Sequence, residues 1–134
     1  MRVWKLATAG LAVLLLAACV TTADIQPMPP IPPDLIEQIH SQPTGGCSGS
    51  LATPTANDYW RAYPARAMEQ GIQGWVVLRI AVAPDGRLTS VQPVQSAPAG
   101  VFEAAAVGII SRLEFPAQPS ECSKLILIQF RQAY

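Results

Sequence analysis

The most restrictive feature of the sequence is an alternating apolar segment that leads into a tight-turn signal. Every second residue over 76–82 is apolar, which is the period of a strand with one buried face. The tetrapeptide APDG follows at 83–86; its proline presets φ, its aspartate caps the turn and its glycine accepts a positive φ. We therefore predict an antiparallel hairpin of residues 75–83 and 87–95.

The flanking segments supply two helices and a third strand. A helix is predicted from an N-cap at Asp58 to Gly71, with Pro64 in its first regular turn. Apolar residues recur at helical spacing over 100–113, which predicts an amphipathic helix. The apolar segment 124–131 is a final strand.

This order of elements restricts the fold class. Helix, strand, strand, helix and strand in succession predict an α+β fold, a two-layer domain over residues 59–134. Its three-stranded antiparallel sheet is expected to carry two helices on one face.

The amino-terminal segment has the features of an export signal. Residues 6–18 are apolar apart from one threonine and follow a basic start, and they are too short to span a bilayer, which takes roughly 20 residues. Leu16-Ala17-Ala18-Cys19 resembles the bacterial lipobox, which is cut just before its cysteine. We expect residues 1–18 to be a lipoprotein signal peptide and Cys19 to carry acyl chains such as palmitate. An ordinary signal or a retained anchor is the alternative.

Residues 19–58 are expected to be a lipid-anchored, Pro-rich linker. The sequence PMPPIPP at 27–33 favours extended polyproline II, and residues 34–40 add a helical turn or two. His40 is interpreted as a solvated residue of that turn. The segment is therefore predicted to tether the domain and to stay outside its sheet.

Two cysteines remain after Cys19. An even pair in an exported protein indicates a disulfide, so Cys47 and Cys122 are predicted to be bonded. A metal site with His40, or a reactive thiol, is the alternative. Three ligands at scattered spacing are weak evidence for zinc.

Composition and charge argue against several function classes. Nine basic and nine acidic residues balance, and loss of Arg2 and Lys5 would leave seven against nine, a net charge of about −2. No basic patch for nucleic acid is visible. A single histidine and no nucleophile–base pair argue against an enzyme, and Asp85 and Glu69 are interpreted as turn and helix-surface residues. No cofactor and no small-molecule substrate are expected.

Residues 59–132 resemble the carboxyl-terminal domain of the TonB family. The shared pattern is Tyr-Pro-x-x-Ala, alternating apolar residues, Asp-Gly, a helix with Phe and Ala, and an aromatic residue before Pro. The matching positions are Tyr63, Pro64, Ala67, Gly74, Val76, Leu78, Ile80, Val82, Asp85, Gly86, Leu88, Phe102, Ala105, Phe115 and Pro116.

The resemblance implies a binding module that pairs its last strand with an extended peptide of an outer-membrane transporter, by strand addition. The chain departs from the family in several respects, and two of them bear most directly on function. A TonB protein keeps a transmembrane helix that couples it to the proton gradient, whereas this chain is expected to lose its only long apolar segment. The approach to Tyr63, often glutamine-rich in the family, is Trp-Arg-Ala here.

The last strand is the predicted partner-binding edge. Pro93 lies within the second strand and disfavours pairing there, whereas the last strand has neither proline nor glycine. Ile126, Ile128 and Phe130 are its expected core face. The predicted edge comprises Lys124, Leu125, Ile126, Leu127, Ile128, Gln129, Phe130 and Arg131.

Two functions agree with these features. The first is a lipid-anchored module that binds an extended segment of an envelope protein, such as a TonB-dependent transporter. The second is a structural envelope lipoprotein that self-associates through the same domain. Because Val20 and not aspartate follows Cys19, the expected location is the outer membrane, facing the periplasm.

Overall fold

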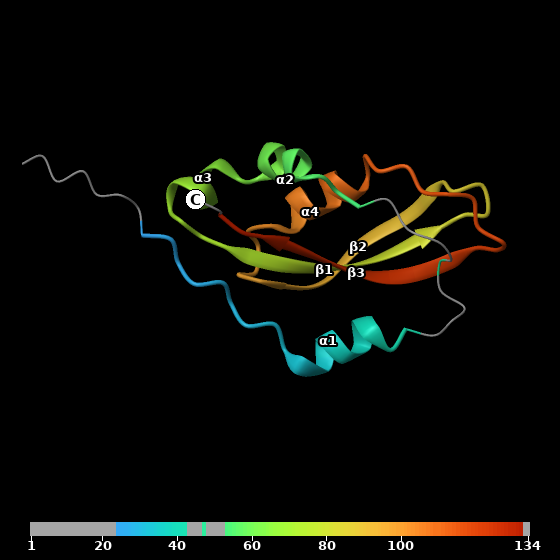
Figure 1. The fold of residues 1–134 in the computed structure, drawn as a ribbon, viewed down its shortest axis with the longest axis horizontal. Helices are drawn as coiled ribbons and strands as arrows, with labels where there is room; N and C mark the ends of the chain where they lie inside the picture. The colour runs from blue at the N-terminus through green and yellow to red at the C-terminus, as the bar shows by residue number, and fades with distance from the viewer. Residues whose placement is uncertain (1–23, 43–46, 48–52, 133–134) are drawn as a thin grey trace, which may run out of the picture.

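The computed structural model describes residues 24–42, Cys47 and residues 53–132, and this part of the chain contains four helices and three strands. In chain order they are α1 (Pro33–His40), α2 (Ala56–Ala62), α3 (Ala65–Glu69), β1 (Gly74–Val82), β2 (Leu88–Ala97), α4 (Glu103–Ile110) and β3 (Cys122–Phe130) (Figure 1). The strands form one antiparallel sheet in the order β2-β1-β3. The predicted α+β class and three-stranded antiparallel sheet are confirmed.

The helix predicted over 58–71 is broken into α2 and α3 at Tyr63. The residue before a proline is disfavoured in the helical region, and Tyr63 accordingly has a ψ of 124°. The true N-cap is Thr55, whose backbone N–H donates to the Asp58 carboxylate at 2.8 Å while its hydroxyl accepts from the Asp58 N–H. Asp58 therefore belongs to a capping box, and its hydrogen bonds to Thr55 lower its pKa.

The main core lies between the sheet and helices α2, α3 and α4. The four alternating residues of β1, Val76, Leu78, Ile80 and Val82, are fully buried there. Phe102 and Phe130 stack with ring centroids 4.6 Å apart, and the Tyr63 ring meets both of them edge-on. Ile128 and Phe130 are buried as predicted, whereas Ile126 is only partly buried at the margin of this core.

Helix α1 covers the opposite face of the sheet, where no helix was predicted. In Figure 1, α1 lies below the sheet whereas α2 and α4 lie above it. Leu35 of α1 packs with Trp75 and Val77, the residues of β1 that point away from the main core, and partly buried apolar residues surround them. Both faces of this part of β1 are apolar, so a second covering layer is needed.

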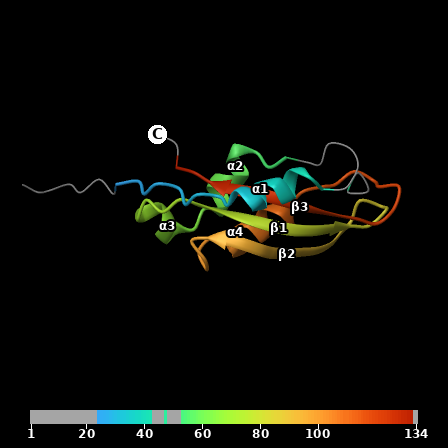
Figure 2. The same ribbon diagram turned by 90° about the horizontal axis from the view of Figure 1, so that it is seen from below.

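Hydrogen bonds hold the chain before α1 along the same side of the domain. The Gln26 N–H donates to the Gly71 carbonyl at 2.8 Å, and the Trp75 indole N–H donates to the Pro29 carbonyl at 3.1 Å. Figure 2 shows this segment and α1 running beside the sheet. Residues 24–42, predicted as linker, are therefore docked on the domain. Local composition could not reveal this, because the partners lie more than 40 residues away.

The turn of the hairpin requires Gly86. Its φ is +87°, and a Cβ atom there would lie 2.4 Å from the Phe115 carbonyl oxygen. Gly100 has a similar φ of +81°, but a Cβ atom there would meet nothing within 4 Å. The two glycines thus share the same backbone constraint and differ in the space around them.

We expect Gly100→Ala to lower the free energy of unfolding by about 1 kcal/mol, since it adds only left-handed backbone strain. Gly86→Ala should cost about 2 kcal/mol more, because the loop carrying Phe115 must also move. Urea denaturation of the two variants would test this. Equal losses would contradict the role of the Phe115 contact.

Candidate functional site

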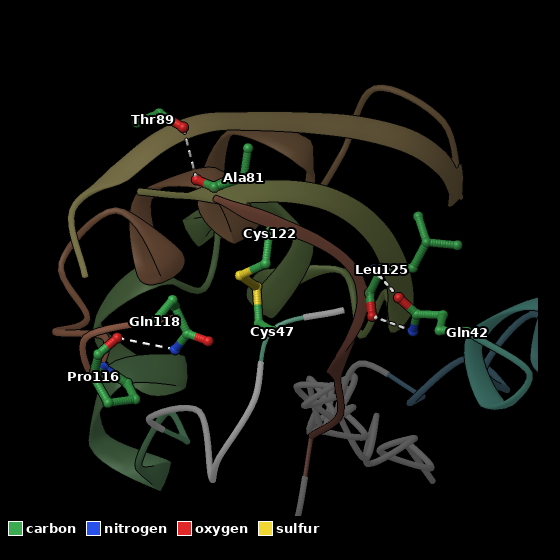
Figure 3. Close-up of a disulfide and its surroundings, with 8 residues drawn as sticks. All are labelled: Gln42, Cys47, Ala81, Thr89, Pro116, Gln118, Cys122 and Leu125. Carbon is green, nitrogen blue, oxygen red and sulfur yellow. Dashed lines mark hydrogen bonds between the residues drawn. A yellow bond between two sulfur atoms is a disulfide. The ribbon is translucent and has the colours of Figure 1, made fainter. Parts of the chain in front are cut away.

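Strand β3 is an outer strand that pairs with β1 alone, which leaves its other edge facing away from the sheet. Backbone groups of successive residues in a strand point to alternate sides. Gln42, which follows α1, shows which residues point outward. Its side-chain amide accepts from the Leu125 N–H at 2.6 Å and donates to the Leu125 carbonyl at 3.0 Å (Figure 3).

Gln42 therefore occupies the edge at Leu125 as the backbone of a neighbouring strand would. By alternation, the N–H and C=O groups of Leu127 and Gln129 point the same way. Among the described residues, neither has a hydrogen-bonding partner on that side. We call these outward backbone groups of Leu127 and Gln129 the free edge. The predicted edge of 124–131 is thus an outer strand, but its first part is already occupied.

A pocket of about 260 Å³ lies beside the free edge, on the face of the sheet that carries α1. We call it the α1-side pocket. Its apolar lining comes from both the helix and the strand, and His40 and Gln129 supply the polar groups. The lining residues are Ile31, Ile36, Ile39, His40, Leu127 and Gln129.

A second pocket, of about 360 Å³, lies at the carboxyl end of β3 and is formed mainly by α2. We call it the aromatic pocket; it is lined by Ala56, Tyr59, Trp60, Tyr63, Gln129 and Arg131. Trp60 is 45% exposed and stacks on Tyr63, whose hydroxyl donates to the Ile72 carbonyl at 2.7 Å. Partial burial raises the pKa of Tyr59 above its ordinary value, so its phenol stays uncharged at neutral pH and well above it.

The two pockets meet at Gln129, which lines both of them. The Gln129 side-chain oxygen accepts from the Arg131 guanidinium at 2.6 and 3.0 Å, which holds this positive charge at the end of the edge. The site therefore combines unpaired backbone groups, two apolar pockets and one cation. It is suited to bind an extended chain.

The opposite edge of the sheet is less suited to strand addition. Pro93 in β2 has no N–H, and it pairs with Leu78 next to a register shift. Residues 92–95 of β2 are exposed, and Val94 among them is 46% exposed. Binding of a partner along β3 stays a prediction.

Cys47 and Cys122 are joined by a disulfide, as the sequence predicted, with an S–S distance of 2.06 Å (Figure 3). Cys122 is the first residue of β3, and Cys47 lies five residues after Gln42. The bond and Gln42 therefore hold positions 42 and 47 against the same strand. The cysteine pair is visible in the sequence, whereas no local motif distinguishes Gln42.

The remaining predictions concern other parts of the chain. Cys19 lies outside the described residues. Where the structure describes the chain, no three His, Cys, Asp or Glu side chains come together as a metal site. No helix in the same part of the chain is long and apolar enough to cross a bilayer.

Comparison with known proteins identifies the family. Residues 61–132, more than half of the chain, match the family described as Gram-negative bacterial TonB protein C-terminal. The chain therefore belongs to the TonB carboxyl-terminal domain family. Domains of this family are non-enzymatic modules that mediate protein interactions in TonB-dependent transport, with outer-membrane transporters and with themselves.

Among solved structures, the fold is similar to that of a TonB carboxyl-terminal domain from Pseudomonas aeruginosa. The TonB carboxyl-terminal domain of Pseudomonas aeruginosa is 17% identical, with a TM-score of 0.51 over 70% of this chain and 93% of that one. The domain from Helicobacter pylori TonB is 24% identical, with a TM-score of 0.49 over 58% of this chain and 80% of that one. No curated protein sequence matches the chain. Helix α1 and Gln42 precede the family match.

Replacing both Cys47 and Cys122 by alanine should lower the free energy of unfolding by about 4 kcal/mol. The bond joins residues 75 apart, and loss of so long a cross-link enlarges the conformational freedom of the unfolded chain. The midpoint of urea denaturation would measure the loss. A midpoint equal to that of the unmodified protein would contradict the prediction.

Proposed function

We propose that this protein is a lipid-anchored, periplasm-facing binding module that takes up an extended segment of another envelope protein by β-strand addition. The free edge is the observation that carries the proposal. Leu127 and Gln129 present unpaired backbone donors and acceptors on an outer strand, which an added strand would satisfy. The binding edge is narrower than the sequence suggested, because Gln42 already pairs with Leu125.

The chemistry of the site favours a particular kind of segment. Both pockets beside the free edge are lined mainly by apolar and aromatic side chains. Arg131 places a positive charge at the far end of the strand. An extended, apolar segment with an acidic residue near one end would complement these features. Membership of the TonB family supports a partner of the outer-membrane transport machinery.

The anchor is the second part of the proposal. Leu16-Ala17-Ala18-Cys19 supports cleavage before Cys19 and its acylation, and two or three acyl chains hold a protein to a bilayer far more firmly than one. Val20 after the cysteine supports sorting to the outer membrane. With this anchor the protein would act as a tethered receptor and not as an energy transducer.

A photoreactive amino acid in place of Gln129 should cross-link the protein to a partner in living cells, since this position lies between the two pockets. The matched control places the same group at Val94, which is exposed on the other outer strand. Mass spectrometry of the adducts identifies the partner. Cross-linking from position 94 and not from 129 would refute binding at β3. Adducts of the protein with itself alone would instead support the self-associating scaffold.

Cys19→Ala should abolish acylation and signal cleavage together, because the cysteine is both the processing site and the acceptor. The intact mass of the unmodified protein from membranes should correspond to residues 19–134 plus acyl chains, with two hydrogens lost to the disulfide. A mass that retains Met1, or an unacylated chain that starts after Cys19, would show that the anchoring proposal is wrong.

A further inference from the structure

We propose that α1 and Gln42 form the second wall of the binding site and select partner segments with consecutive large apolar residues. This inference rests on the proposed strand addition at the free edge. It assigns a recognition role to residues 33–42, which lie before the part of the chain that matches the family. The free edge alone would accept any extended backbone.

Gln42 fixes α1 in place beside the edge. Its Nε2 atom donates to the Ile39 carbonyl at 2.7 Å, in the last turn of α1, and also to the Leu125 carbonyl. One side chain therefore ties the end of the helix to β3 and closes the edge at Leu125. An added strand cannot pair with Leu125 while Gln42 is there, so its register is limited to the edge beyond that residue.

Strand geometry then places the partner's side chains. A residue opposite Gln129 points its side chain to the same face as Gln129, which is the face covered by α1. The next residue on either side points to the other face, toward α2. The first side chain meets the α1-side pocket and its neighbour meets the aromatic pocket, since Gln129 lines both.

This arrangement requires apolar residues at successive positions of the partner. A segment that alternates polar and apolar residues would fill only one of the two pockets. The α1-side pocket is lined by three isoleucines and one leucine, which offer no hydrogen bond from their side chains. The occupant is therefore an extended segment of another protein with at least two adjacent large apolar residues.

A second copy of the chain is a poor occupant for this site. Its own β3 has the apolar sequence LILI at 125–128, but those side chains are already engaged in its core. Ile128 is 1% exposed, and Leu125 and Leu127 pack against the cluster beneath α1. They cannot enter the pockets of a neighbour unless its domain opens.

The test selects random ten-residue peptides, displayed on phage, against the full exported chain with its disulfide intact. Selected peptides should contain adjacent large apolar residues, and a synthetic copy should slow hydrogen exchange at Leu127 and Gln129. Ile36→Asp places a charge in the α1-side pocket at a residue that is 38% exposed. We expect it to weaken binding of that peptide about tenfold.

Gln38→Asp is the matched control, because it adds the same charge to an exposed position of α1 outside the pocket lining. It should change binding less than twofold. Ile36→Ala removes apolar surface without adding a charge and should weaken binding about threefold. Because alanine disturbs the packing of α1 less than aspartate does, this variant keeps the test valid if Ile36→Asp detaches the helix from the sheet. Thermal unfolding of all three variants reports whether the domain is intact.

The outcomes separate this inference from the proposed function. If the peptide protects Leu127 and Gln129 but binds the Ile36 variants as tightly as the original chain, the role of α1 is wrong and strand addition stands. If no selected peptide protects those two amides, the proposed function itself fails. If protection appears without peptide and rises with protein concentration, a second copy is the occupant and the inference is overturned.

Discussion

Burial of β1 on both faces is the constraint on which the rest of the structure depends. Val76 and Leu78 face the main core, while Trp75 and Val77 face α1, and all four are at most 1% exposed. A strand of this kind needs a covering layer on each side. Helices α2, α3 and α4 supply one of them. The other is recruited from the Pro-rich segment before the domain, and this recruitment brings α1 and Gln42 to β3.

The elements predicted correctly are those that local sequence determines. Alternation in β1 and the turn at Gly86 define the hairpin, and helical periodicity defines α4. The docked segment was missed because its decisive contacts are long-range. The Trp75 indole bonds to Pro29, 46 residues away, and Gln42 bonds to Leu125, 83 residues away. A proline-rich composition indicates an extended backbone, but it does not reveal whether that backbone packs on a sheet.

Docking of this segment also changes how far the domain could reach. Treated as a free, fully stretched polyproline linker, residues 19–58 would span about 120 Å. In the structure the chain is already held at Gln26, whose N–H bonds to Gly71. With an anchor at Cys19, seven residues would then separate the lipid from the domain, a span of at most about 25 Å. Under the proposed anchoring, a module held so close to the bilayer would suit a partner in the same membrane better than one across the periplasm.

The short free edge explains why the pockets matter for affinity. Exposed strand edges invite unwanted pairing, and both edges here are restricted, β2 by Pro93 and β3 by Gln42. Beyond Leu125, what remains on β3 is two outward residues, which can form about four hydrogen bonds at a net ~1 kcal/mol each. Ordering the backbone of five partner residues costs about 1–2 kcal/mol per residue. Backbone pairing alone therefore cannot hold a flexible segment, and the binding free energy must come from side chains buried in the two pockets that meet at Gln129.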